Sequence, residues 1–187
     1  MTCHPDCIRA IAHADMIVFC PGSFLTGIIS ALLTRGIQTA LRVSPAMKVQ
    51  VVNIMTHAGQ TDGMSARDHI EAFAQYLGIA PDVALVNTAR PPERWLKSYR
   101  KEGAEPVRLD VAGLRETRIV AGDFLEPAGK DVLTLYERGG RGMLVGSHFI
   151  RHDPAKLGKA LLSVLRARPP KRRGTERRFP APRLPGA

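Results

Sequence analysis

The sequence has 187 residues, enough for one domain, and its 44% of hydrophobic residues is ordinary for a globular protein. Its formal net charge of +10 would by itself indicate a nucleic-acid partner. Aromatic residues make up only 5%, too few to build stacking platforms for single-stranded nucleic acid. No apolar run approaches the ~20 residues of a membrane helix, and the N-terminus lacks the pattern of a secretory signal, so we expect no membrane partner. An odd number of cysteines, three, suggests reduced thiols and a cytoplasmic location.

Most of the positive charge lies at the C-terminus. Residues 166–187 contain eight basic residues, one acidic residue and five prolines. Their few apolar residues show no helical or strand period, so we expect a disordered basic tail over residues 167–187, after a folded domain over residues 1–166. A solubilising tail is the simpler interpretation, and non-specific contact with nucleic acid or anionic surfaces is the alternative.

The first half of the chain alternates between helical and strand-like patterns. A helix is predicted over residues 5–13, a strand over 15–20, and a helix over 24–34 with Ser23 as its N-cap and Gly36 just past its end. A strand over 49–54 and a polar loop over 55–63 follow. Ser65, Asp68 and Gly78 then delimit a helix over 66–77, in which His69 is expected to point outward or toward a pocket.

The second half continues the alternation. The pattern predicts a strand over 82–87, a helix from Pro91-Pro92 to about Lys101, short strands over 106–109 and 118–121, and a strand over 143–149. Asp153 and Pro154 begin a last helix. Helices that follow strands this regularly predict an α/β fold with a mostly parallel sheet covered on both faces. Such sheets bind ligands at the carboxyl ends of their strands, here just after Cys20, Ile54 and Asn87.

Pro21-Gly22-Ser23, between the first strand and its helix, is the first candidate site. A glycine allows close approach of a ligand, and the N–H groups and dipole of the helix favour an anion such as phosphate. An ordinary strand-to-helix turn is the alternative. The segment is neither a Walker loop nor the G-x-S-x-G elbow of hydrolases.

The loop NIMTHAGQTDG, residues 53–63, is the second candidate. It is dense in hydrogen-bonding side chains, and Gly59 and Gly63 permit sharp turns. Adjacent parallel strands would bring it beside the first candidate, although a plain surface loop is the alternative. Cys3, His4 and Cys7 are too few for a zinc site, and no Ser/His/Asp or Cys/His set indicates a nucleophile. We therefore predict no metal ligands and assign no catalytic residues.

CPGSFLTGI, NIMTHAGQTDG, the following DHIEAF and the later RHDPAKLGKALL together resemble the gluconeogenesis-factor (YvcK-like) family, which is related to 2-phospho-L-lactate transferase, CofD. The resemblance implies a Rossmann-like three-layer sandwich and a cytoplasmic regulator that binds UDP-sugars, notably UDP-N-acetylglucosamine, and is linked to carbon metabolism and cell shape. The alternative it implies is a transferase that attaches a phospholactyl group to a deazaflavin with a divalent metal such as Mg²⁺. Carried over by position, the ligand-binding residues would be Pro21, Gly22, Ser23, Thr26, Asn53, Thr56, Gly59, Thr61, Asp62 and Gly63.

Two departures from the family pattern affect these expectations. Gln60 stands where the family usually has glutamate, and a neutral amide is a poorer ligand for a hard cation, so Mg²⁺ is expected only in the transferase alternative. Family members also carry a glycine-rich GGGTG-type turn well upstream of the PGS segment, so the fold is expected to be N-terminally incomplete. A truncated product, a misassigned start and a divergent short form are all compatible with this. An uncovered sheet edge would favour a homo-oligomer.

Overall fold

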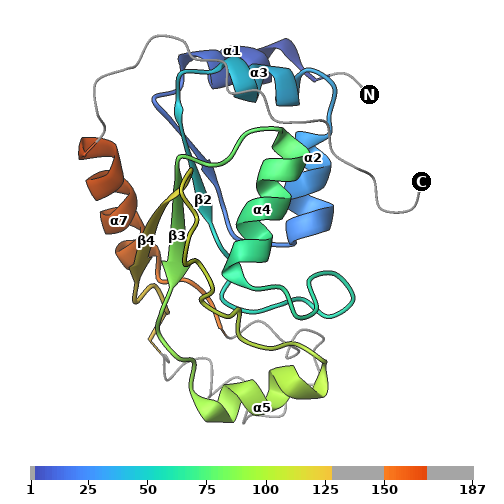
Figure 1. Ribbon diagram of the computed structural model, residues 1–187, viewed down its shortest axis with the longest axis vertical. Coiled ribbons are helices and arrows are strands. Elements are labelled where there is room, and N and C mark those ends of the chain that lie inside the picture. The colour runs from blue at the N-terminus through green and yellow to red at the C-terminus, as the bar shows by residue number, and fades with distance from the viewer. Residues whose placement is uncertain (1–2, 128–149, 168–187) are drawn as a thin grey trace, which may run out of the picture.

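A computed structural model of the protein describes residues 3–127 and 150–167. Four parallel strands form one sheet in the order β1-β2-β3-β4 (Figure 1). The predicted α/β class with a parallel sheet is therefore confirmed. The strands are β1 (Met16–Phe19), β2 (Met47–Val51), β3 (Val83–Asn87) and β4 (Arg118–Gly122).

The connection from β1 to β2 differs from the single helix that was predicted. It begins as a π-helix, η1 (Phe24–Ile29), continues as a short α2 (Ser30–Leu32), and is followed by α3 (Ile37–Val43). Gly36 has a φ of +93°, a conformation that few residues other than glycine adopt, and it turns the chain into α3. The glycine therefore stands at the start of a second helix as well as beyond the end of the first.

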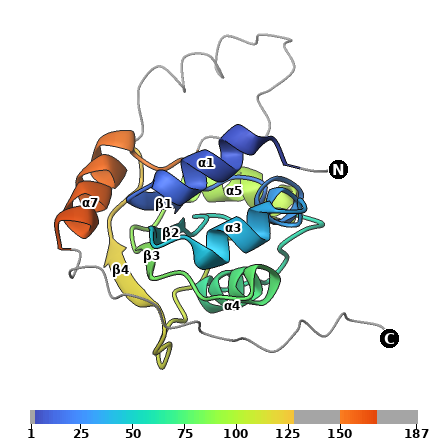
Figure 2. The same cartoon turned by 90° about the horizontal axis from the view of Figure 1, so that it is seen from above.

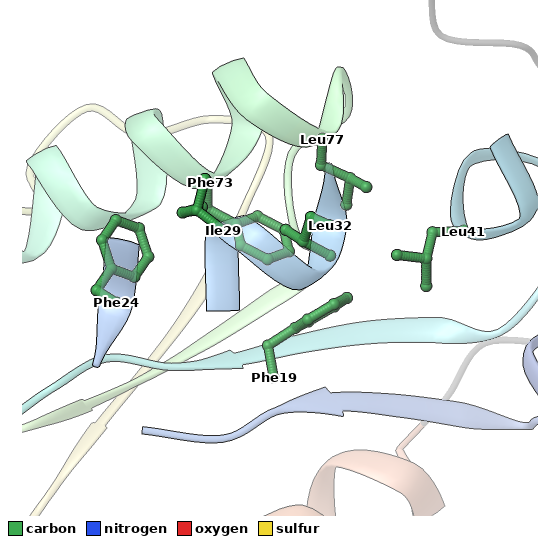
Figure 3. Close-up of a cluster of buried hydrophobic side chains, with 7 residues drawn as sticks. All are labelled: Phe19, Phe24, Ile29, Leu32, Leu41, Phe73 and Leu77. Atoms are coloured by element: carbon green, nitrogen blue, oxygen red, sulfur yellow. The ribbon is translucent and has the colours of Figure 1, made fainter. Parts of the chain in front are cut away.

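One face of the sheet is covered by η1, α2, α3 and α4 (Ala66–Leu77). Helix α4 begins and ends as predicted, with a capping box between Ser65 and Asp68 and with Gly78 in the left-handed conformation. Phe19 of β1 points toward these helices, and its ring packs edge-on against Phe73 of α4 with centroids 4.6 Å apart (Figure 3). The buried residues of this cluster are Phe19, Phe24, Ile29, Leu32, Leu41, Phe73 and Leu77.

The opposite face is covered by α7 (Pro154–Arg166), as Figure 2 shows. Asp153 caps this helix as predicted, since its Oδ1 accepts hydrogen bonds from the N–H groups of Ala155 and Lys156. Val164 of α7 packs with Val49 and other buried residues of β2 and β3. The sheet therefore has helices on both faces.

Two further helices complete the described part. Helix α1 (Pro5–His13) matches its prediction, and α5 (Glu93–Lys101) lies beyond the carboxyl ends of the strands (Figure 1). Only an isolated antiparallel bridge between Met55 and Pro106 forms in the segment predicted as a strand over 106–109. The strand predicted over 143–149 and the basic tail from residue 168 onward lie outside the described residues. None of the described helices combines the length and the apolar character needed to cross a bilayer.

Candidate functional site

Gly22 and Asn53, which follow β1 and β2, join the two predicted loops. The Gly22 N–H donates to Asn53 Oδ1 over 3.1 Å, and Asn53 Nδ2 donates to the Gly22 carbonyl over 2.8 Å. This reciprocal pair holds the Pro21-Gly22-Ser23 turn against the end of β2. The prediction that neighbouring parallel strands bring both loops together is confirmed.

Ser23 extends the connection between the loops. Its hydroxyl donates to Gln60 Oε1 over 3.0 Å and lies 2.6 Å from the hydroxyl of Thr26. Because Ser23 has one proton, which it gives to Gln60, the hydroxyl of Thr26 must be the donor in the second bond. Ser23 occupies the N-cap position as predicted, but its side chain makes no capping bond to η1. The first backbone N–H groups of η1 therefore depend on other acceptors.

The turn leaves space around Gly22. A Cβ atom added to this residue would meet no atom within 4 Å, so packing does not require glycine here. Gly22 is exposed and its neighbours Pro21 and Ser23 are half-buried. An exposed turn with unfilled space and helix N–H groups beside it is the kind of surface at which anions bind.

The threonines of the second loop are turned inward. Thr56 and Thr61 are only 5% and 0% exposed. The Thr56 hydroxyl accepts the Glu105 N–H over 2.9 Å, and the Thr61 hydroxyl accepts the His57 N–H over 2.8 Å. Both side chains thus fix the shape of the loop. Direct contact of these residues with a ligand remains a prediction.

Asp62 is exposed on the same loop. Its Oδ2 accepts the Gly59 N–H over 2.8 Å, and the flanking Gly59 and Gly63 have φ values of +77° and +68°. Within residues 3–127 and 150–167, no group of three or more His, Cys, Asp or Glu side chains is placed to hold a metal ion. Gln60 carries a neutral amide and Asp62 is bonded within its loop, so in the described part of the chain this loop offers Mg²⁺ no cluster of carboxylates.

Two histidines lie near these loops, of which His69 is buried and His152 is half-buried. His69 is 0% exposed, its Nδ1 is 2.8 Å from the Ser65 carbonyl, and its ring lies 4.9 Å from that of Phe24. The expectation that it points outward or toward a pocket is wrong, because it shares the apolar face of α4 with Ala66 and Phe73. Burial lowers its pKa, against a hydrogen bond to the Ser65 backbone. Its neutral form is therefore favoured.

His152 precedes α7 and approaches β2. Burial lowers its pKa to about 4, opposed by a hydrogen bond to the backbone of Val52. The imidazole is therefore neutral near pH 7 and carries no charge toward a ligand. Among the described residues, its Nε2 and that of His69 are buried without a hydrogen-bond partner.

The third strand end carries a cavity, as expected for the segment after Asn87. It has a volume of about 330 Å³ and lies between the Asn87–Pro91 loop, α5 and the Pro106–Leu109 segment. None of the ten residues predicted to bind a ligand lines it. The position of the cavity was predictable from the parallel sheet, but its arginine-bearing rim was not, since Arg90 and Arg100 belong to no recognisable motif.

Comparison with known proteins places these observations in a family context. A family profile described as 2-phospho-L-lactate transferase CofD matches residues 1–125. The chain is 36% identical over 166 residues to a Thermotoga maritima protein, covering 87% of this chain and 48% of that protein. It is 31% identical over 163 residues to the gluconeogenesis factor of Bacillus subtilis, covering 87% and 46%.

The fold is also similar to that of a solved structure. The crystal structure of a UPF0052-family protein from Bacillus halodurans superimposes with a TM-score of 0.72 at 30% identity, covering 86% of this chain and 46% of that one. The chain thus spans about half the length of the relatives it matches.

Proposed function

The chain belongs to the CofD family, and from this premise we propose that it is a nucleotide-sugar-binding regulatory protein of the gluconeogenesis-factor type. Its ligand would resemble UDP-N-acetylglucosamine, and its role would be cytoplasmic and linked to carbon metabolism and cell shape. The observation that carries the proposal is the Gly22–Asn53 pair, which fixes an open turn at the start of η1. A gluconeogenesis factor among its relatives supports the gluconeogenesis-factor type.

The two halves of such a ligand would use different residues. The diphosphate would lie at the Pro21-Gly22-Ser23 turn, where helix N–H groups supply a favourable field for an anion. Asp62 would accept hydrogen bonds from ribose or sugar hydroxyls, since a carboxylate beside the diphosphate would repel it. Asn53 and Thr26 would hold the turn in place through the bonds described above.

Calorimetric titration with UDP-N-acetylglucosamine and with UDP tests this assignment. Ser23→Ala should weaken both ligands by roughly 1 kcal/mol, because the phosphate-side turn is common to them. Asp62→Ala should weaken the sugar nucleotide by at least as much, because its hydroxyls lose a charged acceptor. Gly22→Ala should abolish binding of both, because the added Cβ would occupy the space assigned to the diphosphate. It should not lower the melting temperature, since that Cβ meets no protein atom within 4 Å.

Gly27→Ala is the matched control. Its Cβ would make an ordinary 3.6 Å contact with Ser23, so it adds the same methyl group one turn away and should leave affinity unchanged. If Gly22→Ala binds as tightly as the unaltered chain, the turn is not the ligand site. If the chain ignores UDP-sugars and turns over a phospholactate donor, the transferase alternative replaces the regulatory proposal.

A further inference from the structure

The cavity after β3 is separate from the turn to which the nucleotide sugar is assigned. Three segments line it on its closed side: the Asn87–Pro91 loop, Leu96 and Arg100 of α5, and Ile54 with the Pro106–Leu109 segment. Its volume of about 330 Å³ lies at the lower end of the range for small-molecule sites. It therefore suits a ligand much smaller than a nucleotide sugar.

Hydrogen bonds fix the walls of the cavity without a ligand. Asn87 Oδ1 accepts the N–H groups of Ala89 and Phe124 over 3.3 and 3.0 Å, and Asn87 Nδ2 donates to the Ala89 carbonyl over 2.7 Å. The Thr88 N–H donates to the Gly122 carbonyl over 2.8 Å. On the other side, the Val107 N–H donates to the Ile54 carbonyl over 2.9 Å. A ligand would enter a largely preformed site and would order few groups on binding.

The floor is apolar and the rim is cationic. Ile54 and Leu96 are 6% and 1% exposed, while the side chains of Arg90 and Arg100 are 81% and 52% exposed. Both guanidinium groups pair with a single carboxylate, that of Glu93. Arg100 has the stronger effect on this carboxylate, and its hydrogen bond holds the pKa of Glu93 below the usual value. Two cations share one anion, so the rim keeps a net positive charge.

We propose that this cavity binds a small amphipathic organic anion, with a phosphate or carboxylate head group at Arg90 and Arg100 and a short apolar body against Ile54 and Leu96. Guanidinium groups suit both head groups, because their fork of N–H donors matches two oxygens. The head group would take over donors that Glu93 now occupies. Glu93 therefore acts as an internal competitor, and its removal should strengthen binding. This inference does not depend on the nucleotide-sugar proposal.

The chain has a single tryptophan, and it provides a reporter. Trp95 lies in α5 next to Leu96 and packs in the same cluster as Ile54. Its fluorescence can be followed during titration at constant ionic strength with butyl phosphate, butyrate, inorganic phosphate and butanol. Butyl phosphate or butyrate should bind at least fivefold more tightly than inorganic phosphate or butanol. Which of the two is tighter identifies the preferred head group.

Three charge variants give a pattern specific to this site. Arg100→Gln should weaken the tighter probe about fivefold to tenfold, because a charge-assisted hydrogen bond is lost. Glu93→Gln should tighten it about twofold to fivefold, because the competing carboxylate is gone. Lys97→Gln is the matched control: Lys97 is exposed on the same helix and does not line the cavity. It should leave the affinity within twofold.

Circular dichroism of each variant checks that α5 is intact. The proposal is overturned if none of the charged probes changes the fluorescence. It is also overturned if Lys97→Gln matches Arg100→Gln, since that would mean a diffuse charge effect, or if Glu93→Gln weakens binding. Equal affinity for butyl phosphate and inorganic phosphate, which share a head group, would remove the apolar part of the proposal.

Discussion

Gly78 ends α4 with a φ of +80° directly beneath the guanidinium group of Arg42, whose Nε donates to the Leu77 carbonyl over 2.6 Å. Gly78→Ala should lower the free energy of unfolding by about 1–2 kcal/mol, because it strains the backbone and pushes Arg42 away. Gly158→Ala in α7 is the control, since its Cβ meets nothing within 4 Å. It should raise stability by about 0.5–1 kcal/mol. Urea denaturation measures both, and equal shifts would contradict the argument.

His152 makes stability depend on pH. Burial lowers its pKa to about 4 in the folded chain, whereas an unfolded histidine titrates near ~6.5. As the pH falls from about 6.5 toward 4, the unfolded chain takes up a proton that the folded chain does not, so stability falls, by up to about 3 kcal/mol. Chemical denaturation of the unaltered chain and His152→Asn at several pH values checks this. The variant should show a clearly flatter profile over that window, and an unchanged slope would exclude His152 as the source.

At the scale of elements, the sequence predicts those helix boundaries that are set by residues close to them in the chain. Helix α4 was predicted to the residue because Ser65, Asp68 and Gly78 form its caps within the chain itself. The form of η1 was not predictable. Its Ile28 N–H bonds to the Ser23 carbonyl over 3.1 Å, the wider π-type turn, while Phe24 and Ile29 are buried in the core. No sequence pattern records that choice, because it depends on tertiary packing.

Some features of the candidate site could likewise be predicted from the sequence, and others could not. Parallel strands predict that the loops after β1 and β2 meet, which the Gly22–Asn53 bonds confirm. Residue type alone does not say which hydroxyl faces a ligand and which faces the backbone, as Thr61 and Ser23 illustrate. His69 could have been placed correctly, because it lies three residues after Ala66 on the apolar face of α4. A helical period that counts histidine as apolar would have found it.

At the scale of the whole molecule, β1 is hydrogen-bonded to one neighbour among the described strands, β2. The Asp15 carbonyl accepts the Met47 N–H over 3.0 Å. Because backbone groups alternate along a strand, Ile17 faces β2 and Val18 faces the other edge. We expect this edge to pair with another copy of the chain. Sedimentation velocity should show a dimer at micromolar concentrations, and a monomer throughout would contradict it.

Two proline variants separate this pairing from folding. Val18→Pro removes an N–H on the outer edge and should yield a folded monomer. Ile17→Pro removes an N–H directed at β2 and should lower the free energy of unfolding by about 3 kcal/mol or more. Thermal unfolding followed by circular dichroism distinguishes the two, and equal loss of stability would mean that the strand edges are assigned the wrong way round.

The order β1-β2-β3-β4 also bears on how the protein is made. Paired residues in successive strands, such as Met16 with Met47, Val49 with Val83 and Val83 with Arg118, are 31, 34 and 35 positions apart. Each strand that leaves the ribosome thus finds its partner already synthesised, and the described sheet grows at one edge in the direction of translation. Helix α7, the last described element, then closes the face left open. A nascent chain stalled before α7 would therefore carry a paired sheet with one apolar face uncovered, the stage at which a chaperone would bind it most readily.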